Sequence, residues 1–379
     1  MKKRIAILGS TGSIGVQSLN VIDKYPELFD VVLLSAFNNR ELLEKQILRF
    51  SPKFAFIQKG NTTLLNKTKI YNSLAPLSDL ETYKDVDIVI NGIVGLAGLA
   101  PTIAALQAKA TLATANKESI ICAGDIINKI AKDNGAKIIP IDSEHSTIFQ
   151  CIGDDIDNVK KIILTASGGA FRDFNKQKIS KLKAKDALIH PTWKMGDKVT
   201  IDSATMMNKG MEIIEAKYLF NVDNIEVIGH NESIVHSMVE MKDGSFIAGL
   251  SAPNMSLPIQ YALTYPKRIN IKQPSLDFKT VKSLNFFNID LERFPCLKIA
   301  QEVACCGMEK AVIMNSANEI LVNAYLRDIV KFYDIPLIIE KALNHFYRDK
   351  VITLDDIYRI DSIVREYTIK QVNQGGLLS

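Results

Sequence analysis

The chain has 379 residues, of which 47% are hydrophobic and 23% are charged. These ordinary values exclude an intrinsically disordered chain, a collagen-like fibre and a simple coiled coil, and at ~150 residues per domain the length predicts two or three domains. The formal net charge is +4, from 46 basic and 42 acidic residues, so the composition favours neither nucleic acid nor an anionic membrane as a partner.

The first third of the chain alternates short aliphatic runs with helical stretches. Strands that alternate with helices imply βαβ units and a parallel sheet, which is an α/β fold. We expect helices from Ile14 to about Lys24 and from Glu41 to Phe50. The expected strands cover residues 4–8, 31–34, 54–57, 86–90, 110–113 and 136–139.

The remaining chain divides into three further segments. Residues 141–268 carry polar, glycine-broken loops between strands such as 161–164 and 225–228. Residues 269–297 show no sustained periodicity and predict an irregular connector. Residues 298–379 predict helices, the last of them with Thr353 and Asp355 as expected caps.

Two features bear on where the protein is located. The five cysteines form no CxxC pair, and adjacent Cys305 and Cys306 suit neither a zinc site nor an ordinary disulfide, so we expect reduced thiols and a cytoplasmic protein. The segment from Ile88 to Leu106 has no charged residue and is nearly long enough to span a bilayer. Because glycines and a proline interrupt it, a buried strand, a glycine turn and a helix explain it better, and we expect no membrane partner.

A glycine-rich segment, Gly9-Ser-Thr-Gly-Ser-Ile-Gly15, follows the first expected strand and opens the first expected helix. A helix N-terminus offers free backbone N–H groups to a phosphate, and glycines let a dinucleotide approach the backbone. The spacing GxxGxxG in this position therefore favours a dinucleotide site over a plain tight turn. In NAD enzymes a carboxylate at the end of the second strand usually holds the ribose. Here that strand ends without a carboxylate and is followed by Arg40, so NADP is favoured.

Polar side chains follow several later strands, where ligands of parallel sheets bind. Lys117, in Asn116-Lys117-Glu118, could hold a substrate oxygen or form a surface salt bridge. On an extended chain Asp142 and Glu144 would point to one side and His145 to the other. Two such carboxylates indicate a site for Mg²⁺ or Mn²⁺, unless they lie in a solvated loop. An expected helix that starts after Thr205 carries Glu212, which could complete the site, and Glu215 lies beside it.

Two loops of the middle segment suit a phosphorylated substrate. The small-residue loop 165–170 contains Ser167, and Ser203, Asn208 and Lys209 add hydroxyl, amide and ammonium donors for a phosphate monoester. Between them lies His190-Pro-Thr-Trp193-Lys-Met195-Gly196-Asp, which contains the only Trp of the chain. A lone Trp is most often a core residue, but this setting favours a flap that closes over a ligand.

Together these motifs resemble the 1-deoxy-D-xylulose 5-phosphate reductoisomerase family. The resemblance rests on the glycine segment, Asn116-Lys-Glu118, Asp142-Ser-Glu-His145, Ala166-Ser-Gly-Gly169 and the block 190–216, which is the most specific, and it extends to Asn315-Ser-Ala-Asn-Glu319. It implies a Rossmann-like, doubly wound N-terminal NADP-binding domain (1–140), a central α+β catalytic domain (141–268), a connector (269–297) and a C-terminal helical bundle (298–379).

The resemblance also implies a role for individual residues. Asp142, Glu144 and Glu212 match the family's metal ligands, and Glu215 an acidic neighbour that supports them. Substrate and phosphate contacts are implied for Lys117, Ser143, Ser167, His190, Ser203, Asn208 and Lys209, with Trp193 and Met195 in the flap. Lys117, Glu144, His190 and Glu215 are the expected catalytic residues. Cofactor contacts are implied for Thr11, Gly12, Ser13, Ile14, Asn38, Asn39, Asn116, Glu118 and Gly196.

The chemistry implied by the family is a metal-dependent rearrangement of 1-deoxy-D-xylulose 5-phosphate, by a retro-aldol/aldol path or an α-ketol shift. Reduction by NADPH then gives 2-C-methyl-D-erythritol 4-phosphate, and the family implies a homodimer. One departure concerns the cofactor: where the family usually has Gly, a basic residue and Asn, this chain has Phe37, Asn38 and Asn39. The alternatives are another two-domain NADP enzyme, such as a semialdehyde or homoserine dehydrogenase, and a non-enzymatic dinucleotide sensor.

Overall fold

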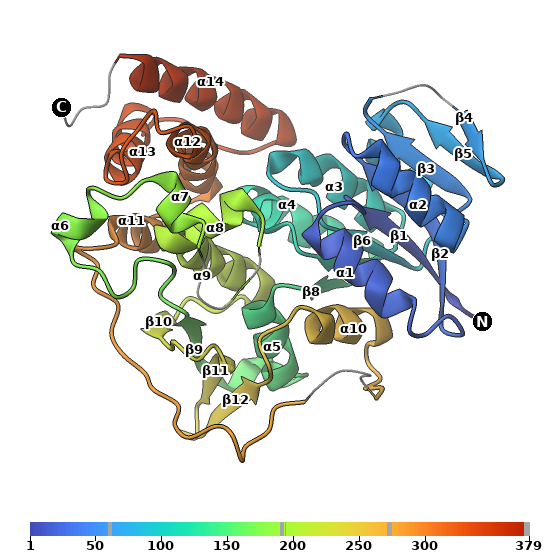
Figure 1. The fold of residues 1–379 in the computed structure, drawn as a ribbon, viewed down its shortest axis with the longest axis horizontal. Coiled ribbons are helices and arrows are strands. Elements are labelled where there is room, and N and C mark those ends of the chain that lie inside the picture. The colour runs from blue at the N-terminus through green and yellow to red at the C-terminus, as the bar shows by residue number, and fades with distance from the viewer. Residues whose placement is uncertain (60–62, 190–192, 194, 271–274, 375–379) are drawn as a thin grey trace. The chain divides into compact units, whose positions relative to one another are not determined.

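A computed structural model describes residues 1–59, 63–189, 193, 195–270 and 275–374 (Figure 1). The chain divides into two compact units that alternate along the sequence. Unit 1 contains residues 1–119, 127–146 and 254–274, and unit 2 contains residues 120–126, 147–253 and 275–379. The boundaries expected from the sequence do not coincide with these units, and they stay a prediction.

Unit 1 is built on a sheet that, within the described residues, has eight strands in the order β4-β5-β3-β2-β1-β6-β7-β8. Only β4 and β5 pair antiparallel. Ile5, Ile7, Val89 and Ile90 are fully buried, which explains why the central strands are continuous aliphatic runs. The bounds are β1 Lys3–Leu8, β2 Phe29–Ala36, β3 Phe54–Ile57, β4 Thr63–Leu65, β5 Thr68–Tyr71, β6 Ile88–Asn91, β7 Thr111–Thr114 and β8 Ile138–Pro140.

The strand order of unit 1 reverses direction between β1 and β6, which makes the sheet doubly wound. Helix α1 packs on β1, α2 on β2, and α3 on β6 and β7 (Figure 1). These helices have the bounds α1 Ser13–Ile22, α2 Arg40–Phe50 and α3 Leu99–Gln107, with α4 Lys117–Asn134, α5 Ser143–Ile152, α10 Ser256–Thr264 and the 3-10 turns η1 Ala75–Ser78, η2 Leu80–Tyr83 and η3 Leu96–Gly98. The predicted α/β class with an N-terminal doubly wound parallel sheet is therefore confirmed.

Unit 2 combines a mixed sheet with helices. Its described strands have the order β10-β9-β11-β12, in which β10 and β9 are parallel and the other pairs antiparallel. The strands are β9 Val159–Ala166, β10 Ile225–Gly229, β11 Val235–Met241 and β12 Phe246–Leu250. The helices of the middle segment are η4 Ile156–Asn158, α6 Lys176–Ile179, α7 Ala184–Ala187, α8 Asp197–Ala204 and α9 Met207–Phe220.

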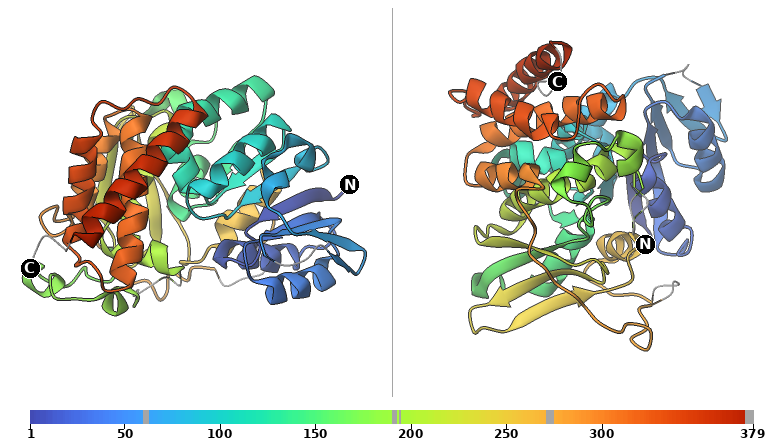
Figure 2. Two further views of the ribbon diagram at one scale, coloured as in Figure 1. Left: turned by 90° about the horizontal axis from the view of Figure 1, so that it is seen from above. Right: turned by 60° about the vertical axis from the view of Figure 1, so that its left-hand side comes forward.

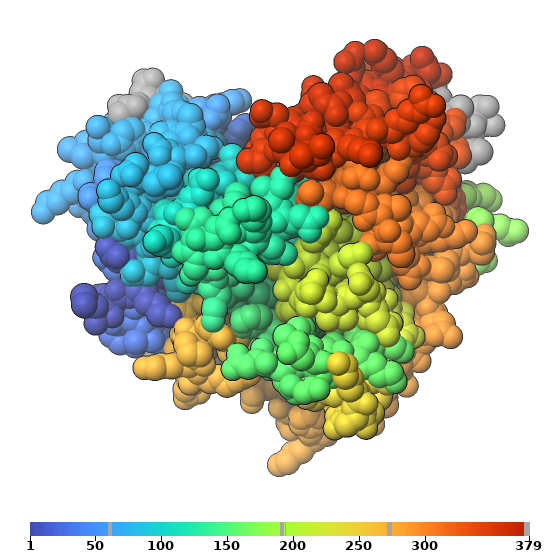
Figure 3. Space-filling model, turned by 180° about the vertical axis from the view of Figure 1, so that it is seen from behind, coloured from blue at the N-terminus to red at the C-terminus, as the bar shows by residue number. Residues whose placement is uncertain are grey.

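The C-terminal part of unit 2 is helical, as the sequence predicts. It contains α11 Pro295–Ala304, α12 Met308–Leu326, α13 Asp334–His345 and α14 Leu354–Asn373. Figure 2 shows α14 crossing over α12 and α13, and in the space-filling view of Figure 3 the red surface of α13 and α14 is continuous. Thr353 caps α14 as expected, accepting a hydrogen bond from Asp356 N–H, whereas Asp355 lies inside the first turn.

The charge-free segment from Ile88 to Leu106 forms β6, the turn η3 and most of α3, as expected. In the part of the chain that the structure describes, every helix is too short or too polar to cross a membrane.

Candidate active site

The glycine-rich segment forms a tight strand–turn–helix connection. Gly9 has a left-handed φ of 75°, and a Cβ placed on Gly15 would lie 2.4 Å from the carbonyl oxygen of Gly9. Only glycine therefore fits where α1 packs against the turn. Gly12 is the N-cap of α1 and brings no side chain of its own. The N–H groups of the first turn, from Ser13 onward, are thus placed at the carboxyl end of β1, as a dinucleotide phosphate requires.

The end of β2 is tied to the glycine turn and to the next helix. The Ser35 hydroxyl accepts a hydrogen bond from Gly9 N–H (3.1 Å). The side chain of Asn39 caps α2 by accepting from Leu42 N–H, and Asn38 is exposed. Arg40, the first residue of α2, donates from Nε to Glu44 (2.8 Å) and from Nη2 to the Thr63 hydroxyl (2.9 Å). A guanidinium is therefore held beside the carboxyl end of β2.

Asn116 and Glu118 are buried where α4 begins. The Asn116 amide donates to the carbonyls of Ile93 (2.7 Å) and Gly95 (2.9 Å) and to the Glu118 carboxylate (3.2 Å). These bonds connect the loop after β6 to the start of α4. The structure gives both residues a role in shaping this loop, and their expected cofactor contacts stay a prediction.

Two of the three expected metal ligands, Asp142 and Glu144, lie at the start of α5. Asp142 is paired with Lys117, with 2.5 Å between Oδ2 and Nζ, and both side chains are largely buried. Ser143 donates from its hydroxyl to the Glu144 carboxylate (2.5 Å). Lys117, Asp142, Ser143 and Glu144, which the sequence separates by up to 27 positions, thus belong to one neighbourhood of unit 1.

The expectation that residues 142–144 form an extended segment is wrong. Helix α5 begins at Ser143, because the N–H of Ser146 bonds to the Asp142 carbonyl (2.8 Å) and closes the first helical turn. Residues three apart on a helix are neighbours. His145, expected to point away, accordingly has its Nδ1 4.0 Å from Oδ2 of Asp142.

In unit 2 the small-residue loop after β9 lies directly on the end of α8. Gly169 has a left-handed φ of 69°, and a Cβ there would meet the Ser203 carbonyl oxygen at 2.4 Å. The loop that carries Ser167 therefore contacts the backbone of Ser203. Arg172 donates from Nη1 to the Ser167 carbonyl (3.2 Å) and secures the loop.

The first two turns of α9 carry the remaining phosphate donors and a carboxylate. Lys209 Nζ lies 2.5 Å from Glu212, and the Asn208 amide donates to the other oxygen of Glu212 (2.5 Å). Lys209 and Glu212 are almost completely buried, and Glu215, one turn further, is fully buried. A helix N-terminus with an ammonium and an amide beside it suits an anion.

The flap is described only in part. His190 lies outside the described residues, as do residues 191, 192 and 194. The Trp193 ring lies 6.2 Å from the ring of His236 on β11, and the His236 Nε2 is 2.9 Å from the Ser251 hydroxyl. Met195 is half-buried and Gly196, the N-cap of α8, is exposed. No sequence pattern indicates His236, because a single histidine within a strand has no distinguishing motif around it.

The predicted residues are divided between the two units. Unit 1 holds the expected cofactor residues except Gly196, together with the following substrate and metal residues: Lys117, Asp142, Ser143 and Glu144. Unit 2 holds Gly196 and the phosphate, flap and α9 residues: Ser167, Trp193, Met195, Ser203, Asn208, Lys209, Glu212 and Glu215.

Sequence profiles of one family match most of the chain. The profile of 1-deoxy-D-xylulose 5-phosphate reductoisomerase matches residues 5–124. The profile of its C-terminal domain matches residues 138–220, and that of a DXP reductoisomerase C-terminal domain matches residues 250–367.

Known proteins are similar to this chain over almost its whole length. The 1-deoxy-D-xylulose 5-phosphate reductoisomerase 1 of Bacillus thuringiensis subsp. konkukian is 45% identical, covering 97% of this chain and 98% of the relative. The enzyme of Chloroherpeton thalassium is also 45% identical, covering 96% and 97%.

Solved structures of reductoisomerases share the fold. A DOX-P reductoisomerase in complex with NADPH, fosmidomycin and magnesium superposes with a TM-score of 0.92 at 38% identity, covering 98% of each chain. The Zymomonas mobilis enzyme in complex with NADPH has a TM-score of 0.89 at 35% identity, covering 98% of this chain and 99% of that one. The chain therefore belongs to the 1-deoxy-D-xylulose 5-phosphate reductoisomerase family.

Proposed function

We propose that this chain converts 1-deoxy-D-xylulose 5-phosphate into 2-C-methyl-D-erythritol 4-phosphate, by a metal-dependent rearrangement followed by reduction with NADPH, in non-mevalonate isoprenoid biosynthesis. The observation that carries the proposal is the 45% identity to named reductoisomerases over 97% of the chain. Solved relatives whose chains match nearly end to end bind NADPH and magnesium. The glycine turn, the carboxylates and the phosphate loop described above are the features that such an enzyme needs.

We assign the metal to Asp142, Glu144 and Glu212. Three carboxylates are a donor set that suits Mg²⁺ or Mn²⁺, and Asp142 and Glu212 each lie beside a lysine that balances their charge. A divalent cation held there would act as a Lewis acid on the substrate carbonyl. Glu215 supports the site as a buried acidic neighbour. Lys117, Glu144, His190 and Glu215 act as the catalytic residues.

The phosphate of the substrate binds to the donors of unit 2. The loop that carries Ser167 contacts Ser203 through Gly169, and Asn208 and Lys209 lie at the N-terminus of α9. Binding energy from this remote phosphate holds the reacting carbons in place. Ser143 and His190 make further substrate contacts, and Trp193 and Met195 cover the substrate.

NADPH binds along the carboxyl ends of β1 and β2 in unit 1. Thr11, Gly12, Ser13 and Ile14 form the loop that holds its pyrophosphate, and Asn38 and Asn39 lie near the adenosine ribose. Asn116 and Glu118 shape the loop on the other side of the switch point, and Gly196 adds a contact from the flap. NADPH supplies the hydride when bound.

The enzyme acts as a cytoplasmic homodimer. The five free cysteines suit a reducing compartment. Strand β12 is an edge strand on which Phe246, Ile247 and Leu250 are exposed, and an apolar edge of this kind is suited to pairing with a second copy. Light scattering should give the mass of a dimer for the purified chain and of a monomer for Ile247→Lys; a wild-type monomer would contradict this assignment.

One assay tests the function. Purified protein, 1-deoxy-D-xylulose 5-phosphate, NADPH and Mg²⁺ are mixed, and the absorbance of the reduced nicotinamide is followed. We expect oxidation of NADPH that requires both the sugar phosphate and the metal. No metal-dependent oxidation would overturn the proposal, and Glu212→Gln should abolish turnover, whereas a dinucleotide sensor would tolerate it.

A further inference from the structure

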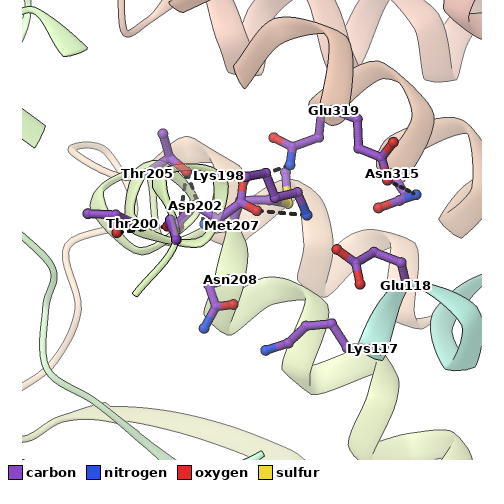
Figure 4. Close-up of polar contacts among 12 residues, drawn as sticks. Lys117, Glu118, Lys198, Thr200, Asp202, Thr205, Met207, Asn208, Asn315 and Glu319 are labelled. Carbon is purple, nitrogen blue, oxygen red and sulfur yellow. Dashed lines mark hydrogen bonds and ion pairs between the residues drawn. The ribbon is translucent and has the colours of Figure 1, made fainter. Parts of the chain in front are cut away.

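A buried polar cluster in unit 2 joins helix α8 to the C-terminal helices. Asp202 of α8 has a side chain that is 1% exposed, and its Oδ1 accepts a hydrogen bond from the amide of Asn318 on α12 (2.8 Å). Its Oδ2 lies 3.0 Å from Nζ of Lys198, one turn earlier on α8 (Figure 4). A buried carboxylate in a helical interface is costly, so its presence calls for a role that an apolar residue could not fill.

Helix α8 connects two parts of the proposed substrate site. It begins directly after the flap residues Met195 and Gly196 and carries Ser203 in its last turn. The Thr205 hydroxyl then donates to the Asp202 carbonyl (3.1 Å) and accepts from Met207 N–H (3.3 Å), which joins the end of α8 to the start of α9. A rotation of α8 about its axis would therefore move Ser203, Gly196 and the turn before Asn208 together.

Apolar packing alone would leave that rotation weakly defined, whereas a hydrogen bond to one residue of α12 defines it. The Asn318 amide is fully buried and points its nitrogen at Asp202. Within the described residues its oxygen has no hydrogen-bond partner, which costs stability. We infer that this costly contact defines geometry more than it adds stability.

We propose that Asp202 is a positioning residue, which through Asn318 fixes the rotation of α8 and thereby the placement of Ser203 and of Met195 and Gly196, which directly precede the helix. The proposal rests on the proposed function, because it assigns a role in binding the sugar phosphate. Helix α12 would thereby help to orient α8. Helix α12 is bonded in turn to α14, from Ser316 to Asp361 (2.6 Å) and from Arg365 to Glu319 (2.5 Å).

The test uses a reciprocal swap. Asp202→Asn removes the charge at nearly constant volume, and Asn318→Asp places two carboxylates face to face. Each single variant should raise KM for 1-deoxy-D-xylulose 5-phosphate by about tenfold, with a smaller effect on kcat. The double variant D202N/N318D restores a carboxylate–amide pair and should recover most of the wild-type KM.

A second measurement does not depend on turnover. Trp193 is the only tryptophan and lies close before α8, so its fluorescence reports on the flap in the full chain. Quenching of this fluorescence by acrylamide should increase in both single variants and return toward wild type in the double variant. Thr368→Val, which removes a buried hydroxyl that donates to the Val364 carbonyl within α14 (2.8 Å), is the matched control and should lower Tm without changing KM or quenching.

The outcomes separate the two proposals. A wild-type chain that does not turn over the substrate refutes the proposed function, while the quenching series still tests the role of Asp202. If both single variants show wild-type KM and wild-type quenching with only a lower Tm, Asp202 is merely structural. A double variant that recovers neither quantity also overturns the positioning role.

Discussion

The ammonium nitrogen of Lys117 lies 2.5 Å from Oδ2 of Asp142, which joins the first turn of α4 to the residue before α5. A second pair of the same kind occurs in unit 2, where Lys209 Nζ lies 2.5 Å from Glu212. In both cases an expected substrate lysine neutralises an expected metal ligand. The carboxylates therefore have a cationic partner before any metal binds.

These pairs predict that the fold does not depend on the metal. Treatment with EDTA should abolish NADPH oxidation, because the Lewis acid is removed, while Tm falls by only a few degrees. Added Mg²⁺ or Mn²⁺ should restore the activity without refolding. Calorimetry with and without EDTA makes the measurement, and a chain that unfolds on chelation would show that the metal is structural.

The carboxylates themselves should determine metal affinity. Asp142→Asn is expected to weaken Mn²⁺ binding by at least about tenfold, because a neutral amide oxygen replaces an anionic ligand. Titration of Mn²⁺ followed by electron paramagnetic resonance measures the affinity directly. Glu226→Gln, which changes an exposed carboxylate paired with Lys161, is the control and should bind Mn²⁺ as wild type does. Equal affinity in Asp142→Asn and wild type would remove Asp142 from the site.

Much of unit 1 could be predicted from the sequence. Continuous apolar runs predicted β1, β3 and β6 to within a few residues, since such runs occur where a parallel sheet is covered on both faces. The error at residues 142–144 has a local cause. A two-residue periodicity fits any short polar segment, and Ser143 starts a helix whose first hydrogen bond comes from Ser146.

Other features depend on contacts between distant parts of the chain. The sequence separates Asp202 from Asn318 by 116 positions, and nothing in either segment indicates that they meet. The same holds for Trp193 and His236, which become neighbours only once β11 has paired with β9. Motifs that lie within a few residues of each other, such as the glycine turn, were therefore predictable, whereas the bonds that orient α8 were not.

Arg40 should determine the choice of cofactor. Arg40 lies two positions after Asn38, which stands where the resemblance implies a basic residue. Glu44 and Thr63 orient its guanidinium. Arg40→Ala is expected to raise the Kd of NADPH about tenfold and to leave that of NADH unchanged, because only the 2′-phosphate of NADPH offers the guanidinium an anionic partner. Nicotinamide fluorescence measures both constants, and Lys45→Ala, which removes an exposed cation of the same helix, is the control. An equal loss for both cofactors would contradict a role in selectivity.

The ion pair between Arg4 and Asp87 should make the stability of unit 1 depend on pH. Burial alone would raise the pKa of the Asp87 carboxyl, but hydrogen bonds from the Arg4 backbone and guanidinium outweigh it and hold the pKa below its ordinary value. A carboxyl with a lowered pKa in the folded state contributes stability above the pKa of the unfolded chain, about 3.9, and loses it as pH falls through the folded value. The free energy of unfolding in urea should therefore differ between wild type and Asp87→Asn at about pH 7, and the difference should shrink below about pH 4. Arg4→Met keeps the backbone hydrogen bond to Asp87, so the difference in unfolding free energy between wild type and Arg4→Met should follow the same trend and be smaller. If the difference between wild type and Asp87→Asn stays constant down to about pH 2.5, this ion pair does not contribute.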